Sequence, residues 1–247
     1  MGNVKRVLLP AAFWLGVWTL CALFIGKEMI LPSPAAVGRA LVILARKGSF
    51  WRSLAWSLSR VLGGLLMGGI LGMGLALATG RWKWADAVFS PALRAVRTVP
   101  VVSFILLLYF SLPTGQVPGA VAALMVLPVV WRAARQGMAS ADDRLLELAG
   151  HYALGRWRTF RYIRLPAALP ALCAGWETGL GLAWKSGVAA EVLCQPKWAA
   201  GAGLQAAKAT LDTAGVMAWT VAIVGVSLTL EWLFRRALGP WRGGEGA

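Results

Sequence analysis

The chain has 247 residues, of which 58% are hydrophobic and 14% charged, and its mean hydropathy is +0.66. This composition excludes an ordinary soluble domain, and several apolar windows approach the roughly 20 residues that a helix needs to cross a bilayer. The net charge of +15 would suit nucleic acid, but the basic residues gather in alternate short loops. We therefore interpret the charge as a topology signal and an attraction to anionic membrane lipid, with no nucleic-acid partner.

The apolar windows predict an all-α integral membrane protein, with residues 1–247 forming a single transmembrane domain. In chain order, about six transmembrane helices are expected over Val7–Ile25, Leu58–Thr79, Thr98–Leu112, Val117–Trp131, Leu169–Val192 and Ala214–Phe234. The third and fourth windows are short and proline-containing, which predicts broken or tilted helices whose freed backbone groups are covered by neighbours. The prolines are Pro100, Pro113, Pro118 and Pro128.

The first window has a basic start, as a secretory signal peptide would. No small-x-small cleavage site follows it, and Leu20 precedes Cys21 where a lipoprotein signal would need a small residue. We expect a retained helix, with the N- and C-termini both cytoplasmic. The inner loops then receive most of the arginines, as the positive-inside rule requires; they include Arg81, Arg94, Arg97, Arg132, Arg135, Arg144, Arg156, Arg158, Arg161 and Arg164.

No catalytic set emerges from the chain, so we predict that it is not an enzyme and needs no cofactor. His151 is the one histidine, which leaves neither a histidine-based catalytic pair beyond chance nor a two-histidine metal site. A phosphate-binding loop of the GxxxxGK[ST] type is also missing from the sequence. The energy for any transport must therefore come from an ion gradient or from a partner.

Small residues recur at four-residue spacing in two of the expected helices. Such spacing lets helix backbones approach closely. One interpretation is ordinary packing inside one subunit, and the other is a subunit interface beside a pathway. The residues are Gly64, Gly68, Gly72, Ala76 and Gly80 in the second helix and Gly175, Gly179, Ala183 and Gly187 in the fifth.

A polar, arginine-rich loop at about 135–166 separates the fourth and fifth windows. Its spacing predicts a short amphipathic helix with Leu145, Leu148 and Ala149 on one face, and with Asp142, Asp143, Arg144 and Glu147 in water. The helix is either a knob for a docking partner or a solvated surface helix.

Within this loop, Glu147, Ala149, Ile163, Leu165 and Pro166 follow the spacing of the EAA loop of bacterial ATP-binding-cassette (ABC) importer permeases. Beyond the loop, the chain resembles the nitrate/sulfonate/taurine-type permeases over nearly its whole length. It includes LPSP from Leu31, SLSRVLGGLLMGGILGMGLAL from Ser57, RTVP ending at Pro100 and LGLAWKSGVAAEV from Leu180. The loop glycine of the family falls on Ala153, which would resist a positive φ, so we expect the loop to turn at Gly155 instead.

The resemblance implies a type I ABC importer permease fold with a cytoplasmic coupling helix, in the bacterial inner membrane. It also implies a permease homodimer, cytoplasmic ABC ATPase subunits that hydrolyse ATP, and an extracytoplasmic solute-binding protein that contacts the loop from Pro196 to Gly215. The solute would be small and anionic, like a sulfonate, nitrate or taurine. The expected ATPase-docking residues are Glu147, Leu148, Ala149, Ala153, Gly155, Ile163, Leu165 and Pro166.

Charges inside the expected helices are the pathway candidates, because a charge at mid-bilayer usually faces a cavity or a partner. They are Arg60, Glu177, Lys185, Glu191 and Glu231. Either these groups neutralise one another, for example Lys185 with Glu191 or Glu231, or Lys185 and Arg60 attract an anion. A gradient-driven secondary transporter remains the alternative function; it would account for the buried charges but not for the EAA loop.

Overall fold

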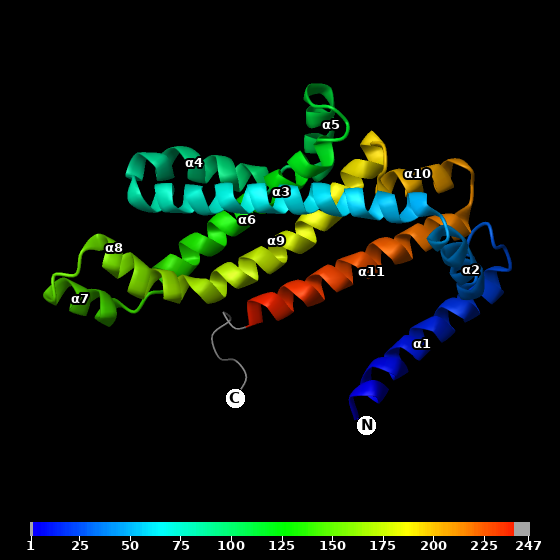
Figure 1. Ribbon diagram of the computed structural model, residues 1–247, viewed down its shortest axis with the longest axis horizontal. Helices are drawn as coiled ribbons and strands as arrows, with labels where there is room; N and C mark the ends of the chain where they lie inside the picture. The colour runs from blue at the N-terminus through cyan, green and yellow to red at the C-terminus, as the bar shows by residue number, and fades with distance from the viewer. Residues whose placement is uncertain (1, 240–247) are drawn as a thin grey trace. The chain divides into compact units, whose positions relative to one another are not determined.

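The computed structural model describes residues 2–239, and all regular secondary structure in that range is helical (Figure 1). The all-α fold class is therefore confirmed. The helices are α1 (Gly2–Ile25), α2 (Pro34–Ala45), α3 (Gly48–Arg81), α4 (Lys83–Val96), α5 (Val101–Ser111), α6 (Val117–Ala139), α7 (Asp143–His151), α8 (Arg156–Thr159), the π-helical turn η1 (Phe160–Arg164), α9 (Leu165–Cys194), α10 (Ala200–Ala209) and α11 (Thr213–Leu238).

Within residues 2–239, three helices are long and apolar enough to cross a membrane, namely α3, α6 and α11. The pair α4 and α5 gives a fourth candidate, but the two helices are bent by 105° at the break between them, and Figure 1 shows α5 turned away from α4. The 30-residue α9 is long enough but carries Glu177, Lys185 and Glu191. All six expected windows fall on helices, and six membrane crossings stay a prediction.

The two proline-containing windows behave differently. The third is broken as expected, since Pro100 stands at the N-terminal boundary of α5, where it interrupts the path from α4. The fourth is not broken, because α6 runs for 23 residues and continues through Pro128; a tilt in the membrane stays a prediction. Pro128 has no N–H, so one backbone carbonyl of α6 lacks its usual hydrogen-bond donor. Pro128 is fully buried, so neighbouring residues cover this part of the helix.

The residues group into two compact units, one of residues 2–57 and 191–226 and the other of residues 58–190 and 227–239. The boundaries fall inside α3, α9 and α11.

In the larger unit, glycines let α3 approach α6 closely. A Cβ at Gly64 would collide with the carbonyl oxygen of Gly119, and one at Gly68 would collide with that of Ala123. On α9, a Cβ at Gly175 would meet the Ala133 methyl group of α6. The small-residue faces of α3 and α9 are thus used for packing inside one subunit, the first of the two interpretations.

The smaller unit has a core built around aromatic rings. Phe50 at the start of α3 packs on Trp219 of α11, with ring centroids 4.9 Å apart. Leu54 and Ala200 complete the buried cluster. A Cβ at Gly203 would overlap the Trp219 ring, so α10 lies directly against α11. This packing positions the N-terminus of α10.

Candidate functional site

The loop between α6 and α9 contains the expected coupling helix, α7. Its N-terminus is capped by Asp142, whose carboxylate accepts a hydrogen bond from the Arg144 backbone N–H at 2.9 Å. An acidic residue, Asp143, lies in the first turn and a basic one, His151, in the last turn, which is the order that the helix dipole favours. The local sequence thus specifies a short helix with a defined start.

The C-terminus of α7 closes in a Schellman motif around Ala153. The Leu154 N–H donates to the Ala149 carbonyl at 2.8 Å, and the Ala153 N–H donates to Gly150 at 3.0 Å. Ala153 adopts a φ of +47°, a left-handed conformation that costs a non-glycine residue about 1–2 kcal/mol. Gly155 has a φ of −59°, so the expectation of a turn at Gly155 was wrong: the chain turns at the position of the family glycine, with alanine there.

The exposure of α7 differs from the expected amphipathic pattern. Ala149 is buried, whereas Leu145 and Leu148 are 48% and 50% exposed. The three residues therefore do not share one buried face; Leu145 and Leu148 lie on an outward one. Glu147 is exposed and has no hydrogen-bond or ion-pair partner among residues 2–239. The exposed surface of α7 thus combines two leucines with an unpaired carboxylate.

The remaining docking candidates lie where the loop joins α9. Ile163 and Leu165 are half-buried and Pro166 is exposed. The Leu165 N–H donates to the Phe160 carbonyl, five residues back, which makes the turn π-helical. Pro166 has no N–H to donate, and its ring crowds the carbonyl four residues before it. This accounts for a widened turn immediately before the proline.

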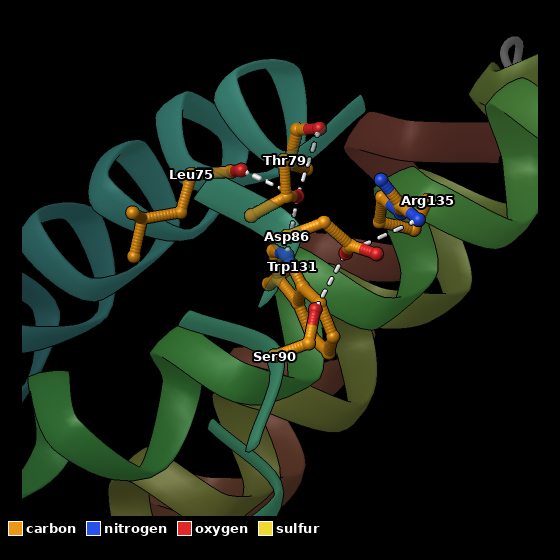
Figure 2. A network of polar contacts seen from close by, with 7 residues as sticks. Leu75, Thr79, Asp86, Ser90, Trp131 and Arg135 are labelled. Atoms are coloured by element: carbon orange, nitrogen blue, oxygen red, sulfur yellow. Dashed lines mark hydrogen bonds and ion pairs between the residues drawn. The ribbon is translucent and has the colours of Figure 1, made fainter. Parts of the chain in front are cut away.

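Polar contacts fix the loop-side end of α6 to α3 and α4 (Figure 2). The Trp131 indole N–H donates to Thr79 Oγ1 at 3.0 Å, and Arg135 pairs with Asp86 at 3.4 Å. Asp86 also accepts a hydrogen bond from Ser90 Oγ at 2.6 Å. Because all three helices meet here, the segment that leads into α7 starts from a firmly held position.

The acidic pathway candidates are satisfied without Lys185. The Arg235 guanidinium lies 2.8 Å from the Glu177 carboxylate and 3.2 Å from that of Glu231. Glu191 is fully buried and accepts a hydrogen bond from Ser57 Oγ at 2.7 Å. The suggested pairing of Lys185 with Glu191 or Glu231 is therefore wrong. Arg60, the other basic candidate, is half-buried in α3.

Lys185 itself lies on an exposed stripe of α9. It has no ion-pair or hydrogen-bond partner in the described part of the chain. The stripe repeats at three- and four-residue spacing, whereas the residues beside it, such as Leu180, Ala183 and Trp184, are buried. Its members are Ala174, Thr178, Leu182, Lys185 and Ala189.

A cavity of about 650 Å³ adjoins the N-terminal part of this stripe. Its lining includes Thr178 and Leu182 from α9, Arg132 and Gln136 from α6, and Arg97 from the break before α5. Sequence reasoning assigned both arginines only to the topology of the inner face. Arg132 and Gln136 lie four residues apart and so share one face of α6, and this spacing was the signal that could have identified Arg132.

Comparisons with known proteins agree on one class of membrane protein. The family model described as "binding-protein-dependent transport system inner membrane component" matches residues 64–239. The taurine transport system permease protein TauC of Escherichia coli is 27% identical, covering 92% of this chain and 85% of that protein. The putative aliphatic sulfonates transport permease protein SsuC of Escherichia coli is 32% identical, covering 77% and 75%.

A third relative, the riboflavin transport system permease protein RibX of Chloroflexus aurantiacus, is 28% identical, covering 98% of this chain and 90% of that protein. Among solved structures, a chain of an amino acid ABC transporter superposes with a TM-score of 0.62 at 15% identity, covering 75% and 89%. One of the MetNI methionine ABC transporter, in an inward-facing conformation, gives 0.61 at 16%, covering 77% and 93%. These similarities confirm the type I importer permease fold.

Proposed function

This chain belongs to the family of inner membrane components of binding-protein-dependent transport systems, and on that premise we propose that two copies of it form the pathway for a small anionic solute. It is an ABC importer permease subunit, a multi-pass protein of the bacterial inner membrane, and a transport subunit, not an enzyme. In the proposal, residues 1–247 act as one permease domain.

The exposed, unpaired Lys185 is the observation that carries the pathway proposal. A lysine near the centre of a helix that faced lipid would cost about 2.5–3.5 kcal/mol on insertion scales. The stripe of Ala174, Thr178, Leu182, Lys185 and Ala189 is therefore better placed against a second copy of the chain and a water-filled pathway. A homodimer that joins the two stripes would bring both Lys185 side chains to one passage.

The charge of the proposed solute follows from the basic groups on this side of the molecule. Arg97 and Arg132 line the cavity next to the stripe, and neither has an ion-pair partner within residues 2–239. Together with Lys185 they offer favourable sites to an anion. Taurine and aliphatic sulfonates, named for two relatives, both carry a sulfonate group. A sulfonate-like anion is thus the solute that we infer.

Coupling to ATP hydrolysis is assigned to the surface of α7. Leu145 and Leu148 offer apolar contacts and Glu147 a carboxylate, and all three side chains are exposed. We infer that cytoplasmic ABC ATPase subunits bind here, which places the loop and both termini in the cytoplasm. Closure of the ATPases would then move α7 and the helices attached to it as a rigid-body switch. The loop of Pro196–Gly215, on the opposite side of the bilayer in this orientation, would receive the extracytoplasmic solute-binding protein.

Affinity purification from solubilised native membranes tests the proposal. Tagged wild-type protein should retain an ATPase with a phosphate-binding loop, identified by mass spectrometry, and the Glu147→Ala/Leu148→Asp double variant should lose it. A wild-type protein that comes down alone and still moves solute in liposomes would make the proposal wrong and establish a gradient-driven secondary transporter.

A further inference from the structure

A second cavity, of about 570 Å³, lies in the larger unit between the end of α3, the end of α6 and the turn from α8 into η1. Three arginines line it: Arg81 from α3, Arg135 from α6 and Arg164 from η1. The apolar part of the lining comes from Leu77, Met138, Trp157 and Phe160. The cavity thus combines a basic rim with an apolar and aromatic wall.

The basic rim carries uncompensated positive charge. Arg135 pairs with Asp86 at 3.4 Å, which holds its guanidinium in place and neutralises part of its charge (Figure 2). Arg81 and Arg164 are exposed and have no ion-pair partner among the residues that the structure describes. Two guanidinium groups with free donors at one cavity are suited to the oxygens of a phosphate.

The π-helical turn shapes the other wall. Phe160 and Arg164 are its first and last residues, and both line the cavity. The Trp157 ring lies 5.9 Å from the Phe160 ring, with the two planes tilted by 30°. Trp157 is 73% exposed. Exposed tryptophan beside arginine is typical of the membrane–water interface, where an aromatic ring lies at the level of the lipid headgroups.

We propose that this cavity binds the headgroup of an anionic phospholipid. Arg81 and Arg164 contact the phosphate, Arg135 adds a third donor group, and the wall of Leu77, Met138, Trp157 and Phe160 contacts the glycerol and the first acyl carbons. The apolar wall favours lipid over a small soluble anion, and the cavity opens at the end of α3, a helix that meets the requirements for crossing a membrane. The proposal needs the chain in a bilayer and does not depend on the solute or on ATPase coupling.

Native mass spectrometry of the full-length permease, in the assembly purified from its own membranes, tests the proposal by titration with phosphatidylglycerol and with phosphatidylcholine of the same acyl chains. We expect saturable binding of phosphatidylglycerol at one site per permease chain and much weaker binding of phosphatidylcholine. The Arg81→Gln/Arg164→Gln variant should lower the affinity for phosphatidylglycerol by roughly tenfold or more.

The matched control is Arg156→Gln/Arg158→Gln, which removes two exposed arginines of α8 that do not line the cavity. It should change the affinity by less than about twofold. An equal loss in the control variant, or equal binding of both lipids, would overturn the proposal. So would displacement of the lipid by millimolar inorganic phosphate, because the site would then be one for a soluble anion. The readout is lipid occupancy, so it stands apart from any failure of the transport function.

Discussion

Glu191 and Ser57, 134 residues apart in the sequence, form a buried hydrogen bond of 2.7 Å in the smaller unit. Ser57 Oγ also accepts a hydrogen bond from the Ala200 N–H at 2.9 Å, and Glu191 accepts one from the Gly201 N–H at 3.1 Å. The two side chains therefore cap the N-terminus of α10, where backbone donors have no partner within the helix. Glu191, a pathway candidate in the sequence, is thus placed as a support for α10.

Replacing Glu191 should destabilise the protein. Glu191→Ala removes the acceptor of a backbone and a hydroxyl donor, and a buried donor left without a partner costs about 1–3 kcal/mol. We expect a loss of roughly 3 kcal/mol, and a smaller one for Glu191→Gln, measured as the thermal midpoint in detergent. The exposed Glu147→Gln is the control and should leave the midpoint unchanged. A fully stable Glu191→Ala protein with no uptake would return Glu191 to the pathway.

Lys185→Met should reduce solute uptake without weakening the ATPase complex. The change removes the unpaired charge from the exposed stripe of α9 and leaves the buried face of that helix intact. We expect transport into proteoliposomes to fall by about tenfold, the effect of removing roughly 1.4 kcal/mol of electrostatic stabilisation from an anion in the pathway. Lys185→Arg keeps the charge and should retain most of the uptake. Normal uptake by Lys185→Met would make Lys185 a structural residue.

Glu147→Ala and Leu148→Asp, tested one at a time, should each uncouple transport from ATP hydrolysis. Both side chains lie on the exposed surface of α7, so we expect neither change to disturb the buried core. Uptake should be lost while the thermal midpoint and the elution volume of the membrane protein stay as in wild type. Wild-type uptake in both variants would mean that α7 is a solvated surface helix.

Ala153→Gly should stabilise the end of α7. Glycine removes the penalty of about 1–2 kcal/mol for a positive φ, of which its larger conformational entropy in the unfolded loop returns about 0.5–1 kcal/mol. The net gain should appear as slower hydrogen exchange of the Leu154 amide. Gly155→Ala is the reciprocal control: its φ is −59° and a Cβ there meets nothing within 4 Å, so exchange should hardly change. The reverse order of effects would place the turn at Gly155 after all.

Gly68→Ala should weaken the contact between α3 and α6. The added Cβ would collide with the Ala123 carbonyl oxygen, and forcing such a contact apart usually costs about 1–3 kcal/mol. Gly74→Ala, in the same helix, meets nothing within 4 Å and should be neutral or slightly stabilising because alanine favours a helix. Thermal midpoints of the two variants give the comparison. Equal midpoints would mean that the helices separate easily at Gly68.

The apolar windows located the main helices because burial in lipid demands long runs of apolar residues, and those runs survive in the sequence. The windows missed helix ends that contain polar residues, because only the apolar runs were counted. α3 begins at Gly48, ten residues before the expected window, because its first turns include Arg52 and several serines and pack in the smaller unit. The sequence also could not show that Pro128 is tolerated inside α6, since that depends on the neighbours that cover it.

The candidate site, too, could be predicted from the sequence only in part. The spacing of Leu145, Leu148 and Ala149 predicts a helix, but only the packing decides which residues face outward. The Glu191 contacts were not predictable because Ser57 and the start of α10 approach Glu191 only when α3, α9 and α10 fold together. The position of Arg97 and Arg132 at the inner face of the membrane stays a prediction, and loop charge alone does not reveal that they line one cavity.

The π-helical turn at Phe160–Arg164 also affects how the helical segments before and after it are rotated relative to each other. From Arg156 the chain stays helical through η1 into α9, so the loop and the α9 stripe share one continuous rod. Each residue advances an α-helix by about 100°, and the widened turn accommodates one extra residue without unwinding its neighbours. Because the wide turn absorbs that residue, deleting one residue there should restore a regular helix with nearly the same phase between α8 and Lys185, whereas deleting one from the regular part of α9 before Lys185 would rotate the two by about a quarter turn. The π-helical turn therefore preserves the angular registration between the loop of α7 and α8 and the helix proposed to line the passage.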